Sequence, residues 1–329
     1  MSVGQGARTT EQRPRDRGTD ASGRSERVDC LIVGGGPAGL TAAIYAARFR
    51  LRTCVVDAGD GRAAQIPCTR NHAGFPEGIA GAELLARMRR QAVKFGVDLQ
   101  SGRVGALGGQ AGDFTAQLPN SRVFRARAVI LATGVFNHRP DIAGELHDQA
   151  LQRGFLRYCP VCDGFEVTDQ NVAVIGSGAH AAKEATFLRA YTDRVTIVPP
   201  DRDACFDAAQ RADLAAIGVA ILSGPAAAFR LEADGLSFEA AGRRLTFDAI
   251  YPALGSTVRS ELARGLGARL TDDGCITVDA HQRTSVPGLY AAGDVVIGLD
   301  QISHAMGEAG VAATTLRNDL AAASPQLRP

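Results

Sequence analysis

The pair of cysteines in the stretch YCPVCDGFE, residues 158–166, is the part of this sequence with the clearest chemistry. Cys159 and Cys162 are separated by two residues, a spacing that suits a redox-active dithiol or one half of a zinc site. Pro160 is a favoured first residue of a helical turn, which would place Cys159 at a helix start, where a thiolate is stabilised. Asp163 comes directly after the second cysteine. It could move the proton that is exchanged when a disulfide opens or closes, or it could simply cap the turn.

The other cysteines favour a redox dithiol over a zinc site. The chain has seven cysteines but no second CxxC, and no pair of histidines has the spacing of zinc ligands. An odd number of cysteines does not suit a disulfide scaffold, and in a long chain from a reducing compartment a CxxC is typically catalytic or metal-binding. We therefore interpret Cys159 and Cys162 as a redox pair and predict no metal site.

A glycine-rich segment near the N-terminus predicts a bound dinucleotide that could exchange electrons with such a pair. An apolar strand at 28–33 is followed by Gly34, Gly36 and Gly39 in the pattern GxGxxG, and then by an Ala-rich helix. The three glycines allow a tight turn, a close approach of the backbone to a pyrophosphate, and close packing of the helix on the strand. A second strand ends on Asp57, about 20 residues farther on, where a carboxylate can bind the adenosine ribose.

The same pattern occurs a second time in the middle of the chain. A strand at 172–175 leads into Gly176, Gly178 and Ala181, a GxGxxA variant that still lets helix and strand pack closely, and a further strand is expected at 194–198. Two such folds indicate two nucleotides, most simply a flavin and a pyridine nucleotide. The alternative is a degenerate second fold that binds nothing.

The residues after the second strand of this fold bear on which pyridine nucleotide is used. The 2′-phosphate of NADP is normally bound by Arg or Lys at this place, because a guanidinium can bind a phosphate through two hydrogen bonds. Here the sequence reads Pro199, Pro200, Asp201 and Arg202. Asp201 would repel a phosphate but could accept from a ribose hydroxyl, which favours NADH. Arg202 keeps NADPH open as the donor.

Two more strand ends predict the rest of a flavin site. A strand near the C-terminus runs into Gly293 and Asp294, where a carboxylate could bind the ribityl hydroxyls of a flavin. A long helix then begins at about Gln301. If its N-terminus points at the flavin pyrimidine, its dipole would stabilise the negative charge of the reduced ring. Another apolar strand ends before Thr133 and Gly134.

Composition and the order of these motifs define the predicted architecture. Aliphatic residues and 38 glycines are abundant, and aromatic residues make up 5% of the 329 residues, a mix typical of an α/β protein with many tight turns. We expect two Rossmann-like, three-layer ββα-type dinucleotide-binding domains, the second inserted into the first. The flavin-binding domain is discontinuous and comprises 28–137 and 266–329, while the pyridine-nucleotide domain, 138–265, carries the CxxC pair. Residues 1–27 are polar and predict a disordered tail.

Charge and hydropathy exclude several other classes of protein. The chain has 36 basic and 35 acidic residues and a net charge of +1, so it lacks the basic footprint of a nucleic-acid-binding protein. No apolar run approaches the roughly 18 residues that would span a bilayer, and the N-terminus lacks the apolar segment of a secretory signal. We therefore expect a cytoplasmic protein that binds neither nucleic acid nor a membrane.

Six motifs resemble, in sequence and in order, those of the low-molecular-weight thioredoxin reductases. They are IVGGGPAGLTAAIYAAR, NHAGFPEGIAGAELLARMRRQAVKFG, LATG, YCPVCDGFE, VIGSGAHAAKEATFL and GLYAAGDV. The resemblance, which covers about 28–320, implies that NAD(P)H reduces FAD and that reduced FAD opens a Cys159–Cys162 disulfide. Cys162 would then face the flavin, Cys159 would attack the disulfide of a thioredoxin-like protein or a small acceptor, and Asp163 would be the acid–base. It also implies a homodimer.

The patterns and the resemblance together assign residues to the two cofactors. Those expected to bind FAD are Gly34, Gly36, Pro37, Ala38, Gly39, Asp57, Gln65, Asn71, Thr133, Gly134, Gly293, Asp294, Gln301 and Ile302. Those expected to bind NADH or NADPH are Gly176, Gly178, Ala179, Ala181, Asp201 and Arg202.

Three differences from a typical reductase leave other functions open. The cysteines enclose Pro-Val where Ala-Thr is usual, the basic clamp for NADPH is replaced by Pro-Pro-Asp, and Asp300 stands where an Arg usually precedes Gln301. A second hypothesis is therefore a dithiol oxidase, or a disulfide reductase fed by ferredoxin, that does not use NADPH. Asp163 and the intact GxGxxA favour the reductase. A third hypothesis is a flavin-binding scaffold protein without turnover.

Overall fold

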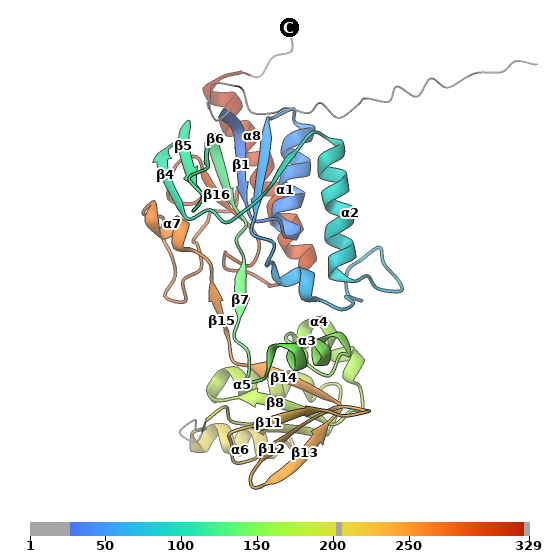
Figure 1. Ribbon diagram of the computed structural model, residues 1–329. Coiled ribbons are helices and arrows are strands. Elements are labelled where there is room, and N and C mark those ends of the chain that lie inside the picture. The colour runs from blue at the N-terminus through green and yellow to red at the C-terminus, as the bar shows by residue number, and fades with distance from the viewer. Residues whose placement is uncertain (1–26, 202–205, 326–329) are drawn as a thin grey trace, which may run out of the picture.

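The chain folds into two lobes joined by a narrow two-stranded connection (Figure 1). The computed structural model describes residues 27–201 and 206–325. The predicted disordered tail lies outside the described residues except for Arg27. This residue begins the first strand, where it pairs with Arg125 and donates a hydrogen bond to the carbonyl oxygen of Gly112. Because the strand pairing already includes it, Arg27 belongs to the folded lobe.

A seven-stranded sheet forms the centre of the first lobe. The strand order is β3-β2-β1-β6-β5-β4, and β16 also pairs with β6. Strands β1, β2, β3, β6 and β16 run parallel to one another. Strands β4 and β5 form an antiparallel hairpin, and β5 pairs antiparallel with β6. The strands are β1 Arg27–Val33, β2 Thr53–Asp57, β3 Asp98–Ser101, β4 Ala106–Gln110, β5 Asp113–Gln117, β6 Val123–Leu131 and β16 Leu289–Ala291.

Helices cover one face of this sheet because their alanines allow close approach. Helices α1, Pro37–Arg48, and α8, Ile302–Ala323, pack against each other and against the strands, and α2, Gly81–Lys94, lies beside α1 (Figure 1). The buried side chains at this contact are small on both helices, so the backbones can pack closely. They are Ala38, Ala42, Ala43 and Ala46 on α1, and Ala305, Ala309, Ala312 and Ala313 on α8.

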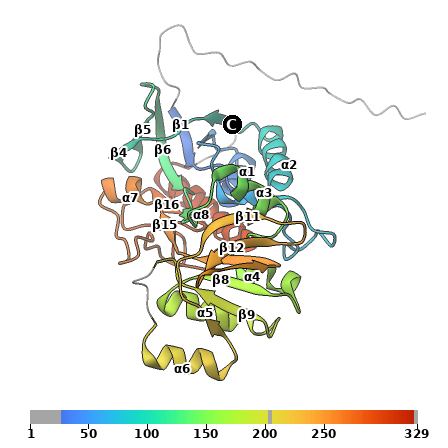
Figure 2. The same ribbon diagram turned by 60° about the horizontal axis from the view of Figure 1, so that its bottom comes forward.

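The second lobe has three layers. Its central parallel sheet has the order β10-β9-β8-β14, with helices α5 and α6 on one face and the antiparallel sheet β11-β12-β13 on the other (Figure 2). Phe238 and Phe247 of the outer sheet stack on each other and are buried against Ile175 of β8. The elements are β8 Val172–Gly176, α5 Gly178–Leu188, β9 Val195–Val198, α6 Ala208–Ala216, β10 Ala220–Ile221, β11 Ala227–Leu231, β12 Leu236–Ala240, β13 Arg243–Phe247 and β14 Ala249–Ala253.

Two short antiparallel strands link the lobes and show that the second is inserted into the first. These are β7, Val135–Asn137, and β15, Ser256–Val258. All strands of the second lobe fall between them in the sequence, and β16 returns to the first sheet. The predicted α/β fold with an inserted second dinucleotide-binding domain is therefore confirmed. The chain returns to the first lobe before the predicted boundary at 265/266. Helix α7, Glu261–Gly265, already buries Ala263 in the core of the first lobe.

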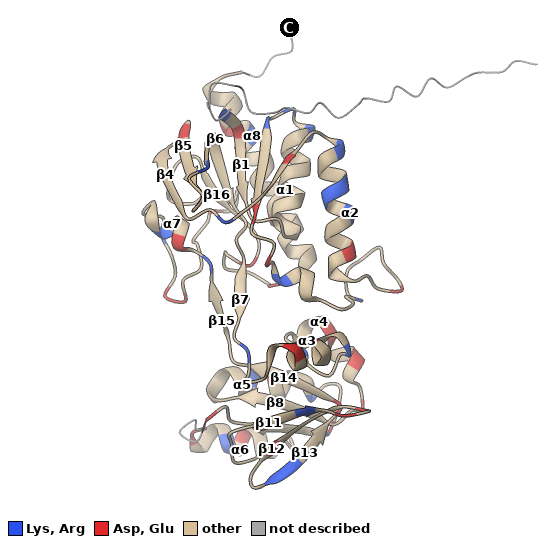
Figure 3. Ribbon diagram, viewed as in Figure 1, with Lys and Arg blue, Asp and Glu red and all other residues tan. Residues whose placement is uncertain are grey.

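Short elements around the connection complete the structure. They are η1 Arg62–Gln65, α3 Gly144–Gln152, α4 Pro160–Asp163 and η2 Gly164–Val167. Acidic and basic residues are interspersed along both lobes (Figure 3). Within 27–201 and 206–325, none of the helices combines the length and the apolar character needed to cross a membrane.

Candidate active site

The predicted redox pair forms a disulfide. The Sγ atoms of Cys159 and Cys162 are 2.07 Å apart, and the pair lies at the start of α4 in the second lobe. Cys159 is the N-cap of this short helix, and its Sγ accepts a hydrogen bond of 3.1 Å from the backbone N–H of Cys162. Pro160 is the first helical residue, as the sequence predicted.

The disulfide faces the first lobe. The side-chain amide of Gln301, the N-cap of α8, donates to Cys162 Sγ at 3.1 Å and to Cys159 Sγ at 3.4 Å. Gln301 is itself held by Asn71, whose Nδ2 donates to Gln301 Oε1 at 2.9 Å, and Thr69 Oγ1 donates to Asn71 Oδ1 at 2.9 Å. Residues from two distant parts of the sequence therefore position a donor against both sulfurs.

A cavity of about 1310 Å³ extends from the disulfide into the first lobe. It collects most of the residues predicted to bind FAD, although they come from several separate stretches of the chain. Those that line it are Gly34, Gly36, Pro37, Ala38, Asp57, Gln65, Asn71, Thr133, Gly134, Gly293, Asp294, Gln301 and Ile302. Gly39 does not line the cavity, because it packs behind the glycine turn.

The geometry of the first glycine turn fits a dinucleotide. Gly34 has φ +110°, and a Cβ there would lie 2.2 Å from the carbonyl oxygen of Ala132. A Cβ on Gly39 would lie 1.9 Å from the carbonyl oxygen of Gly34, so this glycine is needed for packing of α1 on the turn. In contrast, a Cβ on Gly36 would meet no atom within 4 Å. The backbone at Gly36, the N-cap of α1, is thus open to a ligand such as a pyrophosphate.

Asp57 is oriented at the end of β2 by three donors. Its Oδ1 accepts from the backbone N–H groups of Gly35 at 3.1 Å and Gly59 at 3.2 Å, and its Oδ2 accepts from Arg89 of α2 at 2.7 Å. A carboxylate fixed at this position can still accept from a ribose hydroxyl with its remaining lone pairs. The residues of the first lobe therefore fit the adenosine end of FAD.

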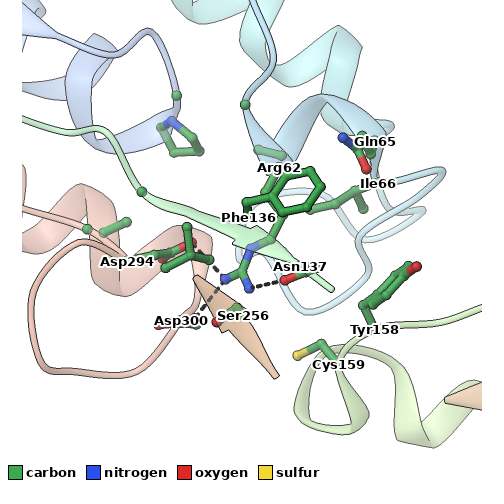
Figure 4. A pocket seen from close by; sticks show the side chains of 18 of the residues that line it. Arg62, Gln65, Ile66, Phe136, Asn137, Tyr158, Cys159, Ser256, Asp294 and Asp300 are labelled. Atoms are coloured by element: carbon green, nitrogen blue, oxygen red, sulfur yellow. Dashed lines mark hydrogen bonds and ion pairs between the residues drawn. The ribbon is translucent and has the colours of Figure 1, made fainter. Parts of the chain in front are cut away.

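Arg62 forms a charged cluster in the cavity that the sequence reasoning did not identify. Its guanidinium donates to Asp294 at 2.7 Å, Asp300 at 3.0 Å and Asn137 at 3.2 Å (Figure 4). Burial and the nearby Asp294 raise the pKa of Asp300, and Arg62 opposes this shift. Asp300, which stands where a typical reductase has Arg, is thus paired with an Arg from η1. The one feature of the sequence that could have indicated this cluster was Asp300 in the place of the usual Arg.

Glu308 supports the predicted ribityl-binding turn from α8. Its Oε2 accepts from the backbone N–H of Gly293 at 2.7 Å, and its Oε1 lies 2.9 Å from Nε2 of His304. Burial raises the pKa of Glu308, while the contacts with Gly293 and His304 oppose the shift. The His304–Glu308 pair therefore fixes the turn before Asp294, at the edge of the cavity.

The Asp163 carboxylate is bonded to two side chains that the sequence did not reveal. Its Oδ2 accepts from Arg157 at 2.9 Å, and its Oδ1 accepts from the hydroxyl of Tyr251 at 2.8 Å. Burial raises the pKa of Asp163, and both donors oppose the shift. Arg157 stands two positions before the first cysteine, so its proximity in sequence is the one feature that could have indicated this contact.

The glycines of the second turn do not line the cavity, although His180, Lys183 and Glu184 of the following helix do. A Cβ on Gly176 would be 2.6 Å from the carbonyl oxygen of Ala253 and 2.9 Å from the Cβ of Ala181, so helix and strand pack closely. Gly178 has φ +61°, a Cβ there would meet no atom within 4 Å, and Ala179 is exposed in the first turn of α5. This turn fits a pyrophosphate. Asp201 follows the end of β9, and the predicted ligand Arg202 lies outside the described residues.

Similarity to known proteins extends over both lobes. The sequence matches the family described as pyridine nucleotide-disulphide oxidoreductase over residues 28–309. The thioredoxin reductase of Mycolicibacterium smegmatis is 35% identical over 284 residues, which cover 82% of this chain and 88% of the relative. The structure of thioredoxin reductase from Streptococcus pyogenes MGAS5005 matches with a TM-score of 0.83 at 27% identity, covering 91% of this chain and all of that one. The structure of HlmI also matches, with a TM-score of 0.83 at 28% identity, covering 91% and 95%.

Proposed function

Because the chain belongs to the pyridine nucleotide-disulphide oxidoreductase family, we propose that it carries electrons from NADH or NADPH through FAD to Cys159–Cys162 and on to a thioredoxin-like protein or a small disulfide. The chain is a flavin-dependent disulfide oxidoreductase of the thioredoxin reductase type. The protein acceptor rests on relatives that are named thioredoxin reductase.

One observation carries the proposal. Gln301, which lines the cavity that fits FAD, donates to both sulfurs of the redox disulfide. The disulfide is therefore within contact distance of the flavin-binding lobe. The amide is nearer to Cys162 than to Cys159, which supports Cys162 as the sulfur that faces the flavin. Bound FAD supplies the two-electron chemistry between a nicotinamide and the disulfide.

The residues of the chain then act on sulfurs and protons. Two electrons break the Cys159–Cys162 bond and leave two sulfurs that take up protons, and Asp163 gives or takes a proton at this step. The Cys159 thiolate attacks the acceptor disulfide, forming a mixed disulfide and releasing one acceptor thiolate. Cys162 then attacks Cys159 Sγ, which restores the disulfide and releases the second thiolate.

The predicted assignment of one cofactor to each lobe is part of the same proposal. FAD would bind between α1 and the N-terminus of α8, and the pyridine nucleotide would bind at the second glycine turn on α5. The open space at Gly36 and at Gly178 supports both sites. Asp201 after β9 supports NADH as the preferred donor, because its charge disfavours a 2′-phosphate.

The surface around the disulfide supports a protein acceptor. Val161, which lies between the two cysteines, is 49% exposed, and Phe165 is 79% exposed. Exposed apolar side chains beside the reactive pair would add apolar contact area for a bound protein. These two residues lie where a thioredoxin-like protein has to approach Cys159.

A homodimer and a cytoplasmic location are further parts of the proposal. Tyr45 of α1 and Val311 of α8 are exposed apolar side chains on neighbouring helices, which supports an interface between two copies. Sedimentation velocity of the purified protein tests the dimer, and fractionation of cells that express the chain tests the location.

The test is an anaerobic titration of the purified yellow protein with NADH and, separately, NADPH, followed by flavin absorbance. We expect bleaching by both, faster with NADH, and then reoxidation on addition of a disulfide-form thioredoxin. Absence of bleaching by either nucleotide, in a protein that a dithiol or reduced ferredoxin can reduce, would overturn the proposal in favour of a dithiol oxidase or a ferredoxin-fed reductase.

A further inference from the structure

Each oxygen of the Asp163 carboxylate has its own donor. Arg157 Nη1 donates to Oδ2 at 2.9 Å, and the hydroxyl of Tyr251 donates to Oδ1 at 2.8 Å. Tyr251 is fully buried on β14, so its position is fixed by the core of the second lobe. The described structure shows no hydrogen bond between this carboxylate and the sulfurs of the disulfide.

Arg157 is held in place and is not a mobile surface side chain. Its backbone N–H donates to the carbonyl oxygen of Ile250 at 2.9 Å, which fastens the residue to the edge of β14. Only 18% of the Arg157 side chain and 24% of the Asp163 side chain are exposed. Because the ion pair is largely desolvated and its geometry is fixed, it interacts more strongly than a pair on an open surface.

Arg157 is the cation that opposes protonation of the Asp163 carboxylate. The groups that act on Asp163 are Arg157, the neutral Tyr251 and the anionic Glu166. Opening of the nearby disulfide would add negative charge at the sulfurs until they take up protons. Burial, Glu166 and a thiolate all favour the protonated carboxyl, whereas Arg157 and the Tyr251 hydroxyl favour the carboxylate. The balance depends on the guanidinium.

We propose that Arg157 is a positioning residue that holds Asp163 as a carboxylate against Tyr251 and thereby fixes the pH range over which the Cys159–Cys162 couple exchanges protons. This rests on the proposed acid–base role of Asp163. When the disulfide is reduced, its bond breaks, two electrons enter, and the new thiols take protons from water. Asp163 relays a proton and returns to the carboxylate that Arg157 and Tyr251 stabilise.

The proposal predicts a direction. If Arg157 is replaced by a neutral residue, the carboxylate loses its cation, so the pKa of Asp163 rises. A carboxyl next to Arg typically titrates about 1–3 pH units lower than it does without the Arg. The proton step linked to Asp163 should therefore move upward by about one pH unit or more in Arg157→Gln, and by less in Arg157→Lys.

The test measures the Cys159–Cys162 couple and does not depend on turnover. The flavin-loaded wild type, R157Q, R157K, D163N and the double variant R157Q/D163N are equilibrated between pH 5 and 9 in reduced and oxidised dithiothreitol. The reduced fraction is read by alkylation and mass. We expect the inflection assigned to Asp163 to move upward in R157Q, to return most of the way in R157K, and to be absent in both variants that carry D163N.

Two results would overturn the proposal. One is an unchanged inflection in R157Q with a lowered melting temperature, which would make Arg157 a packing residue. The other is an equal shift when R157Q is added to D163N, which would mean that Arg157 acts on the thiols directly. If R157Q does not fold, Tyr251→Phe removes a single hydroxyl from the same carboxylate and must give a smaller upward shift. If the proposed function is wrong, neither NADH nor NADPH bleaches the flavin, a result that the thiol titration does not depend on.

Discussion

The two glycine-rich folds of this chain have the same sequence pattern but differ in how tightly the turn is packed and in what surrounds it. In the first, a Cβ on Gly39 would overlap the turn, Asp57 is held by three donors, and α8 adds a second helix over the cavity. In the second, Ala181 replaces the third glycine, a Cβ on Gly178 would meet no atom within 4 Å, and the glycines of the turn do not line the cavity. This contrast is consistent with the proposed roles, a retained FAD in the first fold and an exchanging pyridine nucleotide in the second.

The disulfide lies between these two folds. Cys159 and Cys162 belong to the second lobe by sequence, yet their contacts with Gln301 turn them toward the first. By the proposal above, FAD would lie next to the redox pair. Residues of the second glycine turn itself do not line the cavity that reaches this pair, although His180 and Lys183 of α5 do. The predictions that follow test this contrast, from the largest expected effect to the smallest.

Cys162→Ser should abolish the step that needs the disulfide and leave the step that needs only the two nucleotide sites. We expect reduction of a disulfide acceptor to fall by roughly a thousandfold or more, because the variant cannot form or restore the disulfide. Flavin bleaching by NADH should persist, since neither glycine turn is altered. Stopped-flow absorbance and an acceptor assay measure the two steps. Acceptor reduction at the wild-type rate would show that the disulfide lies off the electron path.

Gly39→Ala gives the first fold the residue that the second fold carries at the same position. The added Cβ would lie 1.9 Å from the carbonyl oxygen of Gly34, so we expect destabilisation of about 3 kcal/mol and loss of bound flavin. The matched control is Ala181→Gly, which should cost about 1 kcal/mol as a helix glycine and leave the flavin content unchanged. Absorbance ratios and urea unfolding report both. If both variants keep their flavin, the two folds are equally tolerant and the contrast fails.

Asp201→Arg should move the second site toward NADPH. A cation in place of the carboxylate would attract a 2′-phosphate, and we expect the ratio of kcat/KM for NADPH over NADH to rise about tenfold, which corresponds to about 1.4 kcal/mol. Asp201→Asn should give an intermediate ratio, because it removes the repulsion without adding a cation. An unchanged ratio in both variants would mean that the 2′-position of the nucleotide does not approach the end of β9.

Asp319→Asn should weaken the far end of α8 by a small, pH-dependent amount. The hydrogen bonds from Arg283, at 2.7 Å and 2.8 Å, hold the pKa of Asp319 below its usual range, and Tyr290 also donates to it. Because the pair is partly exposed, we expect a loss of about 0.5 kcal/mol. A carboxylate with a depressed pKa stabilises the fold above its unfolded pKa of about 3.9, and this contribution is lost as the pH falls further.

Urea unfolding of the wild type and of Asp319→Asn at pH 7 and at pH 3 measures this effect. The difference between the two proteins should be present at pH 7 and shrink at pH 3. A difference that grows at low pH would contradict the assignment, since it would mean that the protonated carboxyl is the stabilising form.

Much of the fold and part of the site followed from local patterns. Short apolar runs predicted β1, β2, β8 and β9 within a residue or two, because burial on both faces of a parallel sheet requires such runs. Gly34 and Gly39 were identified by the GxGxxG pattern between a strand and a helix, and the structure gives the reason, since a Cβ at either position would overlap the backbone. The CxxC spacing and the lack of further zinc ligands predicted a redox pair, the resemblance implied a disulfide, and the structure shows the two sulfurs bonded.

The rest depended on which distant residues meet. Arg62 reaches Asp300, Tyr251 reaches Asp163, and the Gln301 amide reaches both sulfurs, although no spacing in the sequence relates the members of each pair. The sequence alone determined two dinucleotide folds and a redox pair, because turn sterics and strand burial act within a few residues. Only the tertiary structure decided what surrounds each ionisable group, because charge and desolvation act through space between segments that the fold brings together.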